Sequence, residues 1–174
     1  MSGCGYPDSL TLCDCGQVRI TVAPEDWHGS AARRADTAAA AASGARVQLG
    51  ILDVVRGSLD EARPLLEEAL DLSLAARSTS FVTLCLAGYA WLAFADGDPG
   101  RAALLEGAAE GLRRRVGLSA WPHLRKVEAD LVAQVRPRLG AARFDRAFSV
   151  GSGLAQQQAV AIVRDQRGTG TQTP

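Results

Sequence analysis

The chain has 174 residues, of which 47% are hydrophobic and 5% aromatic, and its 19 basic and 19 acidic residues leave a formal net charge of zero. This length suits one compact domain or a short array, and zero net charge excludes binding to nucleic acid or to an anionic membrane through overall charge. Few aromatic residues and many alanines favour helices over sheets. We therefore expect an all-α protein.

The first 28 residues are predicted to form an amino-terminal segment distinct from the rest. Its apolar residues alternate with polar ones on either side of a turn-like stretch at 14–17, which favours a β-hairpin. The alternating residues are Leu10, Leu12, Val18, Ile20 and Val22. Because an isolated two-stranded ribbon is marginally stable, we expect this segment either to pack on helices or to be disordered. It lacks the basic start and apolar run of a secretory signal.

Residues 29–166 are predicted to form one helical domain, followed by a disordered tail at 167–174 that is rich in Gly and Thr. An alanine-rich stretch at 30–43 predicts a first helix, and a second is expected at 45–56. Gly57 can adopt the left-handed conformation that closes a helix, so we expect the second helix to end there.

Two stretches of this domain, 49–72 and 89–112, repeat the same pattern of small and apolar residues forty positions apart. The matching pairs are Leu49 and Tyr89, Leu52 and Leu92, Gly57 and Gly97, Ala62 and Ala102, Leu65 and Leu105, Ala69 and Ala109, and Leu72 and Leu112. A fixed period of this size is typical of stacked helical hairpins. The sequence therefore predicts two related hairpins.

Start and stop residues mark the remaining helices of the two hairpins. Ser58 and Glu61 form a capping-box pattern, which predicts a helix starting immediately after Gly57. Asp98 followed by Pro99 supplies a cap and a preorganised first turn for the last helix of the second hairpin. The helix before that cap is expected to run from Thr79 to Ala95.

After Gly117 the repeat decays into further helices. A helix is predicted at 121–139, where Pro137 and Gly140 terminate it. Its apolar residues at helical spacing are Leu124, Val127, Leu131 and Val135.

A short helix at 141–150, a joint at 151–153 and a last helix at 154–163 are predicted to complete the domain. The short helix should turn Phe144, Ala147 and Phe148 inward. The last helix should turn Ala155, Ala159 and Ile162 to one face.

The spacing of small residues in the two hairpins resembles the tetratricopeptide repeat. The first copy carries Leu49, Gly50, Gly57, Ala62, Leu66, Ala69 and Leu70, and the second carries Tyr89, Ala90, Gly97, Asp98, Ala102 and Ala109. The copies are degenerate, because the second lacks the large residue expected between Ala102 and Ala109, and Asp53 stands at a normally apolar position. The resemblance implies an array of helical hairpins, with small residues where helices touch and extra carboxy-terminal helices.

The order of elements also resembles the carboxy-terminal helical arm of actinobacterial LuxR-type or adenylate-cyclase-type ATP-binding transcriptional regulators. The first part of this pattern is Ala95, Gly97, Asp98, Arg101, Ala102, Leu105, Gly107, Ala108, Ala109, Glu110, Leu112, Arg113 and Gly117. The second part is Arg136, Leu139, Gly140, Phe144, Ala147, Gly151, Leu154, Ala159, Val160 and Ala161. The resemblance covers about residues 45–163 and implies a signalling arm.

The motifs of the other domains of such regulators are missing. The sequence has no glycine-rich phosphate loop and no helix-turn-helix with a basic recognition helix. We therefore expect an isolated arm, a truncated copy or a short paralogue, without enzymatic activity and without a cofactor or metal.

The cysteines and histidines do not form a pattern typical of catalysis. A zinc site would use Cys4, Cys13, Cys15 and His28. One-residue spacing between two ligands is not that of the common zinc pairs, so reduced thiols are expected instead. Cys85 should be a buried small side chain, and His123 a surface or helix-capping residue.

Two features suggest a contact surface. Residues 113–146 contain nine basic and three acidic residues, which could face an acidic partner or a phosphate backbone, although exposed arginines are usually solvated. Of the rings at Tyr89, Trp91 and Phe94, at least two should pack in the core and the rest could meet a ligand. The candidate ligand or partner surface is Tyr89, Trp91, Arg113, Arg114, Arg115 and Arg125.

The sequence as a whole predicts a cytoplasmic, non-enzymatic module for protein–protein interaction or signal sensing. Its partner would be an unidentified protein, another domain of a regulator or a second copy, and neither membrane contact nor direct nucleic-acid binding is expected. The alternative is a small-ligand sensor with a pocket between the helices around Tyr89 and Trp91. A hydrolase or transferase would rest on two histidines and four cysteines alone.

Overall fold

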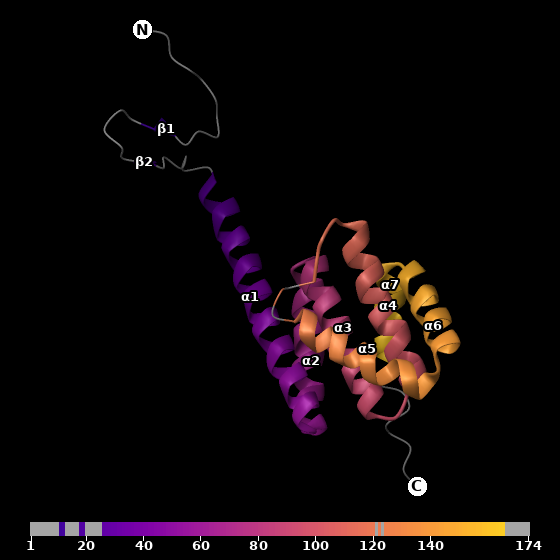
Figure 1. The fold of residues 1–174 in the computed structure, drawn as a ribbon. Coiled ribbons are helices and arrows are strands. Elements are labelled where there is room, and N and C mark those ends of the chain that lie inside the picture. Colours follow the sequence, from indigo (N-terminus) through magenta and orange to yellow (C-terminus); the bar gives the residue numbers. More distant parts are fainter. Residues whose placement is uncertain (1–10, 13–17, 20–25, 121, 123, 166–174) are drawn as a thin grey trace. The chain divides into compact units, whose positions relative to one another are not determined.

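The computed structural model describes residues 11–12, 18–19, 26–120, 122 and 124–165, and Figure 1 draws them as ribbon. Contacts within the chain divide it into two units, Met1–Asp36 and Thr37–Pro174. The sequence predicted a boundary after residue 28, which falls in the first turn of a long helix. The predicted tail at 167–174 lies outside the described residues.

The first unit contains a short antiparallel ribbon and the first turns of helix α1. Strand β1 (Thr11–Leu12) pairs with strand β2 (Val18–Arg19), and Thr11 lies opposite Arg19. The outer residues of the predicted hairpin lie outside the described residues. Each strand has only two residues, so the ribbon has few cross-strand contacts.

The second unit is helical throughout its regular elements in the described residues. Its helices are the end of α1 (Asp26–Arg56), α2 (Leu59–Ala75), α3 (Thr79–Ala95), α4 (Pro99–Arg115), α5 (Arg125–Leu139), α6 (Ala141–Gly153) and α7 (Gln156–Asp165). In Figure 1, α3 lies between α2 and α4, and α6 lies beyond α4, while α7 contacts both α3 and α4. None of the described helices combines the length and the apolar character needed to cross a membrane.

Helix α1 is continuous where the sequence predicted two helices with a break between residues 43 and 45. Gly44 lies buried inside α1 and packs on the ring of Phe81 in α3. A side chain at this position would overlap that ring, so this glycine allows two helices to approach closely and does not end one. The alanines around it are strong helix formers, which keeps α1 intact.

The turns inside the two hairpins have the same geometry forty residues apart. Gly57 after α1 and Gly97 after α3 both have left-handed backbone, with φ of +87° and +84°. In each turn the next amide donates a 2.8 Å hydrogen bond to a carbonyl in the last turn of the helix, Asp53 in the first case and Ala93 in the second. The helices that follow, α2 and α4, are each 17 residues long. The sequence period therefore recurs in the helix bounds and turns.

The starts of α2 and α4 use different caps. Asp98 Oδ1 accepts a 2.9 Å hydrogen bond from the amide of Arg101, as the predicted cap requires. Ser58 makes no capping hydrogen bond with its side chain, so the predicted capping box with Glu61 is wrong. The two cap residues have similar backbone, with ψ of 65° at Ser58 and 79° at Asp98, and the longer carboxylate reaches an amide that the hydroxyl does not.

The bounds of α5 and α6 differ from the prediction. Helix α5 begins at Arg125, and the predicted start at Trp121 lies outside the described residues. Residues 151–153 form the last turn of α6 and not a joint, because Gly151 is buried and its backbone packs on Leu104 of α4. The predicted glycine joint is therefore a helix contact.

The carboxy-terminal helix starts later than predicted, and its buried face differs from the predicted one. Leu154 has extended backbone, with ψ of 138°, and α7 begins at Gln156. Ala155 is consequently exposed and lies outside the helix. The buried residues of α7 are Ala159, Val160 and Val163, and the predicted Ile162 is half-buried.

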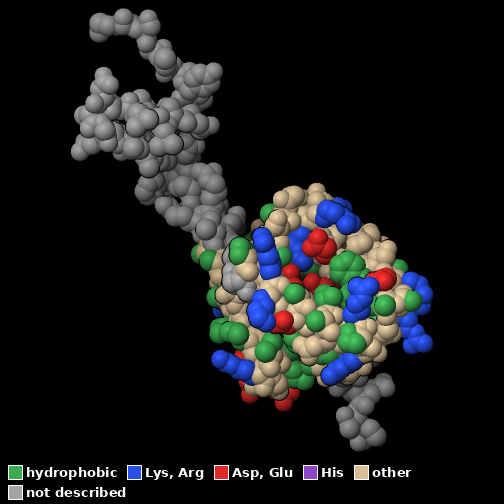
Figure 2. All heavy atoms as spheres, in the orientation of Figure 1, with side chains coloured by type: hydrophobic (Ala, Val, Ile, Leu, Met, Phe, Trp, Pro, Cys, Tyr) green, Lys and Arg blue, Asp and Glu red, His purple; other side chains and the backbone are tan. Residues whose placement is uncertain are grey.

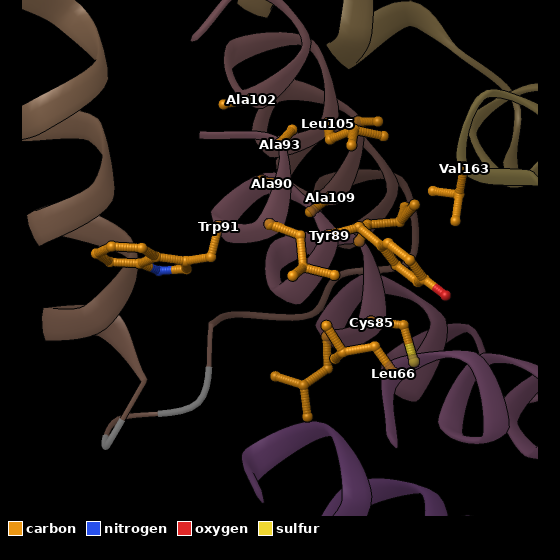
Figure 3. Close-up of a cluster of buried hydrophobic side chains, with 14 of the residues drawn as sticks. Leu66, Cys85, Tyr89, Ala90, Trp91, Ala93, Ala102, Leu105, Ala109 and Val163 are labelled. Atoms are coloured by element: carbon orange, nitrogen blue, oxygen red, sulfur yellow. The ribbon is translucent and has the colours of Figure 1, made fainter. Parts of the chain in front are cut away.

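Helix α3 is the centre of the core. Its seventeen residues carry no charge, and every residue from Val82 to Phe94 is buried. A helix that is apolar on all sides is stable in water when other elements surround it. Figure 3 shows its side chains reaching Leu66 of α2, Leu105 of α4 and Val163 of α7.

Helices α4 and α6 are in contact through their backbones. A side chain at Gly107 would overlap the carbonyl of Phe148, and one at Gly111 would overlap the carbonyl of Ser152. These glycines are one helical turn apart, so together they form a smooth strip along α4. The strip lets α6 lie directly on α4.

Candidate interaction surface

The described part of α1 has one apolar side in the core and another in solvent. Val47, Ile51 and Val54 are buried at helical spacing. The α1 stripe, on the other side, consists of Leu49, Leu52 and Val55. Their exposed fractions are 52%, 47% and 54%. Scattered exposed leucines are common, but a row of large apolar residues on one helix is typical of a contact surface.

In the second hairpin, the corresponding residues of α3 are buried in the core. Tyr89 and Leu92, forty residues after the first two residues of the α1 stripe, are 5% and 1% exposed. The same side of α3 carries Cys85, whose Sγ lies 3.6 Å from the hydroxyl of Ser73 in α2. Two of the three stripe residues are thus equivalent to buried positions, while Ala95, the equivalent of Val55, is exposed, and the described residues leave the α1 stripe about half exposed.

A cleft of about 350 Å³ joins the end of the α1 stripe to α3 and α5. It is lined by Val55, Trp91, Val127, Asp130, Ala133 and Gln134. The indole of Trp91 is 8% exposed, and its Nε1 is buried with no hydrogen-bond partner among the described residues. Because Val55 belongs to both, the stripe and the cleft form one continuous surface.

Tyr89 and Trp91, which the sequence placed around one pocket, point to different sides of α3. In Figure 3 the ring of Trp91 points away from the labelled cluster, and the ring of Tyr89 points toward Val163. Both rings are buried, as is that of Phe94, so the prediction that at least two of the three pack in the core is confirmed. The rings of Trp91 and Phe94 meet edge to face at 6.4 Å.

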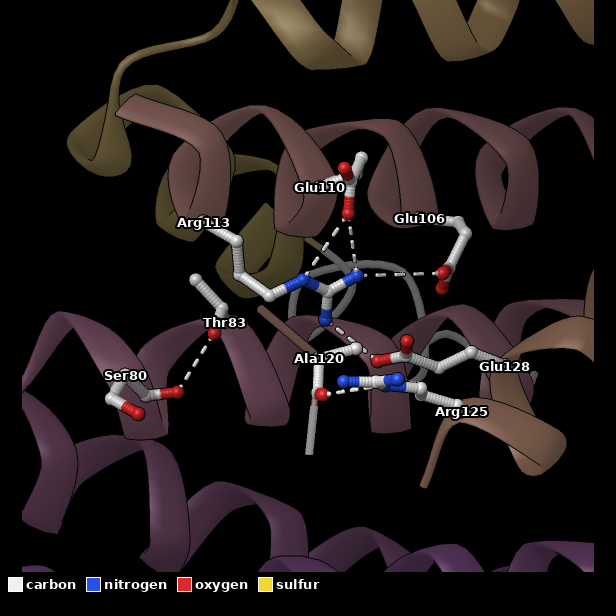
Figure 4. Close-up of polar contacts among 8 residues, drawn as sticks. All are labelled: Ser80, Thr83, Glu106, Glu110, Arg113, Ala120, Arg125 and Glu128. Carbon is white, nitrogen blue, oxygen red and sulfur yellow. Dashed lines mark hydrogen bonds and ion pairs between the residues drawn. The ribbon is translucent and has the colours of Figure 1, made fainter. Parts of the chain in front are cut away.

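Arg113 is buried among three glutamates, as Figure 4 shows. Its side chain is 6% exposed, and its Nη1 lies 2.7 Å from Oε1 of Glu128 in α5. Its Nη2 lies 3.1 Å from Oε2 of Glu110 and 4.0 Å from Oε1 of Glu106, both in α4. The buried ion cluster of these four residues joins α4 to α5.

Glu106 is the least satisfied member of the buried ion cluster. It is 5% exposed, and its Oε2 has no hydrogen-bond partner among the described residues. Burial, and to a smaller extent the charge of Glu128, raise the pKa of Glu106 to about 8, against the opposing effect of Arg113. The carboxyl is therefore largely neutral near pH 7, which lowers the cost of burying it.

The six residues of the predicted surface do not come together. Arg113 is buried, and Arg114 is exposed in the last turn of α4. Arg115 donates a 2.8 Å hydrogen bond to the carbonyl of Ser152 and another to that of Leu154, so it caps the end of α6. Arg125 is exposed and donates to the carbonyl of Ala120 at 3.1 Å.

Basic side chains are spread over the face that Figure 2 shows, with acidic side chains between them. Several arginines of the basic stretch at 113–146 have partners, such as Arg136, which lies 3.1 Å from Asp145. The excess of arginine in sequence therefore does not translate into one basic patch on this face. Its predicted contact with an acidic partner stays a prediction.

Three residues of the zinc alternative, Cys4, Cys13 and Cys15, lie outside the described residues. His123 lies outside them as well, so its predicted surface or capping role stays a prediction. Within the part of the chain that is described, no group of three or more His, Cys, Asp or Glu residues could hold a metal ion. Cys85 is fully buried with a free thiol, and burial raises its pKa to about 12. The prediction of a buried structural cysteine is confirmed.

The α1 stripe and the buried ion cluster were not predicted, although the sequence contains a signal for each. The α1 stripe is visible as large apolar residues that continue the repeat pattern at its start. The buried ion cluster is visible at Glu106, which stands forty residues after Leu66, at the position where the second repeat lacks its large residue. A carboxylate at a repeat position that is otherwise leucine indicates a charged contact with the next helix.

Comparison with known proteins gives this surface no precedent. No protein-family model, no curated protein and no solved structure matches the chain. The resemblances to tetratricopeptide repeats and to a regulator arm therefore stay predictions, and the function is argued from the geometry alone.

Proposed function

We propose that this chain is a non-enzymatic helical repeat module that binds a protein partner through the α1 stripe. The observation that carries the proposal is the exposure of Leu49 and Leu52, whose equivalents Tyr89 and Leu92 are buried in the core. Fully burying one such side chain contributes about 1.5–3 kcal/mol, so covering the stripe is favourable. A signalling arm of the LuxR-type regulator kind would use such a face for its partner or for another domain.

The proposed occupant is an amphipathic helix of another polypeptide. Cys85 and Gly88, next to Tyr89 on α3, pack on α2, which presents Leu66, Leu70 and Ser73, all buried. By the same period, the α1 stripe fits a helix that presents leucines and small residues at spacings of three and four. The neighbouring Ala45 is exposed and small, which lets such a helix approach α1 closely.

Site-specific photocrosslinking in the cells that express the chain tests this proposal. A benzophenone amino acid replaces Leu52 in the stripe, and in a matched control it replaces Leu118, which is 41% exposed outside the stripe. We expect a covalent adduct at position 52 that is lost in the variant Leu49→Ser. Mass spectrometry should place the crosslink in a helix with leucines on one side.

Three results would overturn the proposal. Equal adducts at positions 52 and 118 would show nonspecific capture. A crosslink to a segment without an apolar helical face, or to a second copy of this chain, would contradict the proposed occupant.

The cleft at Trp91 favours a second function, that of a small-ligand sensor. Its lining combines the buried indole of Trp91 with the apolar Val55 and Val127, beside the polar Asp130 and Gln134. A variant with Trp27→Phe and Trp121→Phe leaves Trp91 as the sole tryptophan, so its fluorescence reports on this cleft. A metabolite that shifts the emission and raises the melting temperature would support the sensor, and a panel without either effect would remove it.

A further inference from the structure

A second cleft, of about 660 Å³, lies between α4, α6 and α7 and does not include the α1 stripe. Its charged lining consists of Asp98, Arg101, Arg143 and Arg146. The lining of this one cleft thus contains three guanidinium groups and one carboxylate. Most arginines elsewhere on the described helices have a carboxylate or carbonyl partner, so this concentration of positive charge needs an explanation.

Two of the three cationic groups of this cleft, those of Arg143 and Arg146, are free to meet an anion. Arg143 and Arg146, one turn apart on α6, form no ion pair with any described residue. Asp98 is occupied as the cap of α4, because its carboxylate accepts from the amide of Arg101. The Arg101 side chain donates from Nη2 to the carbonyl of Ile162, while its Nε is buried without a partner in the described part of the chain.

The same cleft has an apolar floor. Leu104, Ala147, Val150 and Ile162 line it together with the arginines. Val150 is 61% exposed, the largest fraction among the exposed large hydrophobic side chains of the described residues. An apolar patch beside convergent guanidinium groups matches a molecule that carries both an anionic group and an apolar body.

We propose that this cleft binds a small organic anion with an apolar body, such as a carboxylate or sulfonate on an aromatic or aliphatic frame. The arginines hold the anionic group through charge-assisted hydrogen bonds, and Val150 with its apolar neighbours covers the body. This site is separate from the α1 stripe, so it adds a ligand to the module and does not restate its partner.

Binding of 8-anilinonaphthalene-1-sulfonate to the full chain tests the proposal, because this probe joins a sulfonate to an apolar body and fluoresces when covered. We expect saturable binding that is roughly tenfold weaker in the variant Arg143→Gln with Arg146→Gln, since two surface charge contacts are lost. Val150→Ser should weaken binding as well. Added salt should also weaken it, because the arginines are near the surface.

Matched controls separate this cleft from other surfaces. Arg114→Gln with Arg125→Gln removes two exposed arginines elsewhere, and Leu49→Ser with Leu52→Ser removes the α1 stripe. Both variants should bind the probe as the original chain does, and circular dichroism should show all variants folded.

Four results would contradict the proposed anion site or one part of it. Equal binding by the Arg143 and Arg146 variant would overturn the site, and loss of binding only in the stripe variant would move the probe to α1. Equally tight binding of the uncharged analogue N-phenyl-1-naphthylamine would remove the role of the anion. Displacement of the probe by equimolar inorganic sulfate would remove the role of the apolar floor.

Discussion

Glu106 links the ionisation of one buried side chain to the stability of the fold. Its pKa rises from 4.5 to about 8 on folding, so between these values the folded state holds a proton that the unfolded state releases. Raising the pH through this window therefore favours unfolding, by up to about 1.4 kcal/mol for each pH unit. The contribution of the neutral carboxyl is complete below the unfolded pKa and is lost as the pH passes 8.

The variant Glu106→Gln is expected to abolish this slope, because glutamine keeps the shape of the neutral acid and cannot ionise. Urea unfolding from pH 5 to 9 should show a falling free energy for the original chain and a flatter profile for the variant, which should be the more stable protein at pH 9. Glu110→Gln is the matched control. Glu110 also contacts Arg113 but its side chain is 45% exposed, so its variant should keep most of the slope. Parallel profiles for the original chain and Glu106→Gln would contradict the assignment.

Cys85 is expected to be chemically inert in the folded protein. Its thiol lies beside the hydroxyl of Ser73 inside the core, and burial raises its pKa to about 12. Because the thiolate is the reactive form, alkylation requires opening of the structure. In a variant with Cys4→Ser, Cys13→Ser and Cys15→Ser, iodoacetamide at pH 8 should label Cys85 in urea and spare it in buffer. Equal labelling rates in both conditions would show that Cys85 is accessible.

At the scale of elements, the contact of α4 with α6 depends on the absence of side chains. Gly111→Ala is expected to destabilise the protein by about 1–3 kcal/mol, because the new methyl group overlaps the carbonyl of Ser152 and the helices must separate. Gly153→Ala, in the same helix pair, is the control. A Cβ at Gly153 meets nothing within 4 Å, so urea unfolding should shift little. Equal effects of the two substitutions would argue against a tight backbone contact.

Helices with strong local signals could be predicted from sequence, and those set by tertiary packing could not. The bounds of α3 and α4 follow from Gly97, Asp98 and Pro99, whose backbone preferences act within a few residues. Glycine elsewhere misled the prediction, since Gly44 and Gly151 lie inside helices. In the sequence, a glycine that ends a helix cannot be distinguished from a glycine that lets the backbone of another helix approach closely. The difference depends on which helix packs beside it.

At the scale of the whole molecule, the forty-residue period gives a matched test of burial. Leu52 and Leu92 hold equivalent places in the two hairpins, yet they are 47% and 1% exposed. Leu92→Ala is expected to cost about 2–5 kcal/mol of stability and Leu52→Ala less than about 1 kcal/mol. Urea unfolding of both variants decides this. Comparable losses would mean that the α1 stripe is covered within the chain.

The candidate site was less predictable than the fold, because exposure depends on which helices follow in space. The sequence marked Leu52 and Leu92 as alike, and the packing around the two repeats makes them different, with exposed fractions of 47% and 1%. Arg113 shows the converse, since a basic residue in a run of three was expected on the surface and is buried by Glu106 and Glu128. The order of positive and negative residues along the chain does not indicate which charged side chains a neighbouring helix places beside Arg113.

The uncharged helix α3 also has a consequence for how this protein folds during translation. Translation supplies α2 first, but the other large cover of α3 comes from α4, which has not yet been made when Ala95 leaves the peptidyl-transferase centre. Until α4 emerges, the nascent chain contains an apolar helix with one side exposed to chaperones or to other nascent chains. A pause in translation while α3 is outside the exit tunnel and α4 is still inside it would prolong that exposure, and the emergence of α4 ends it.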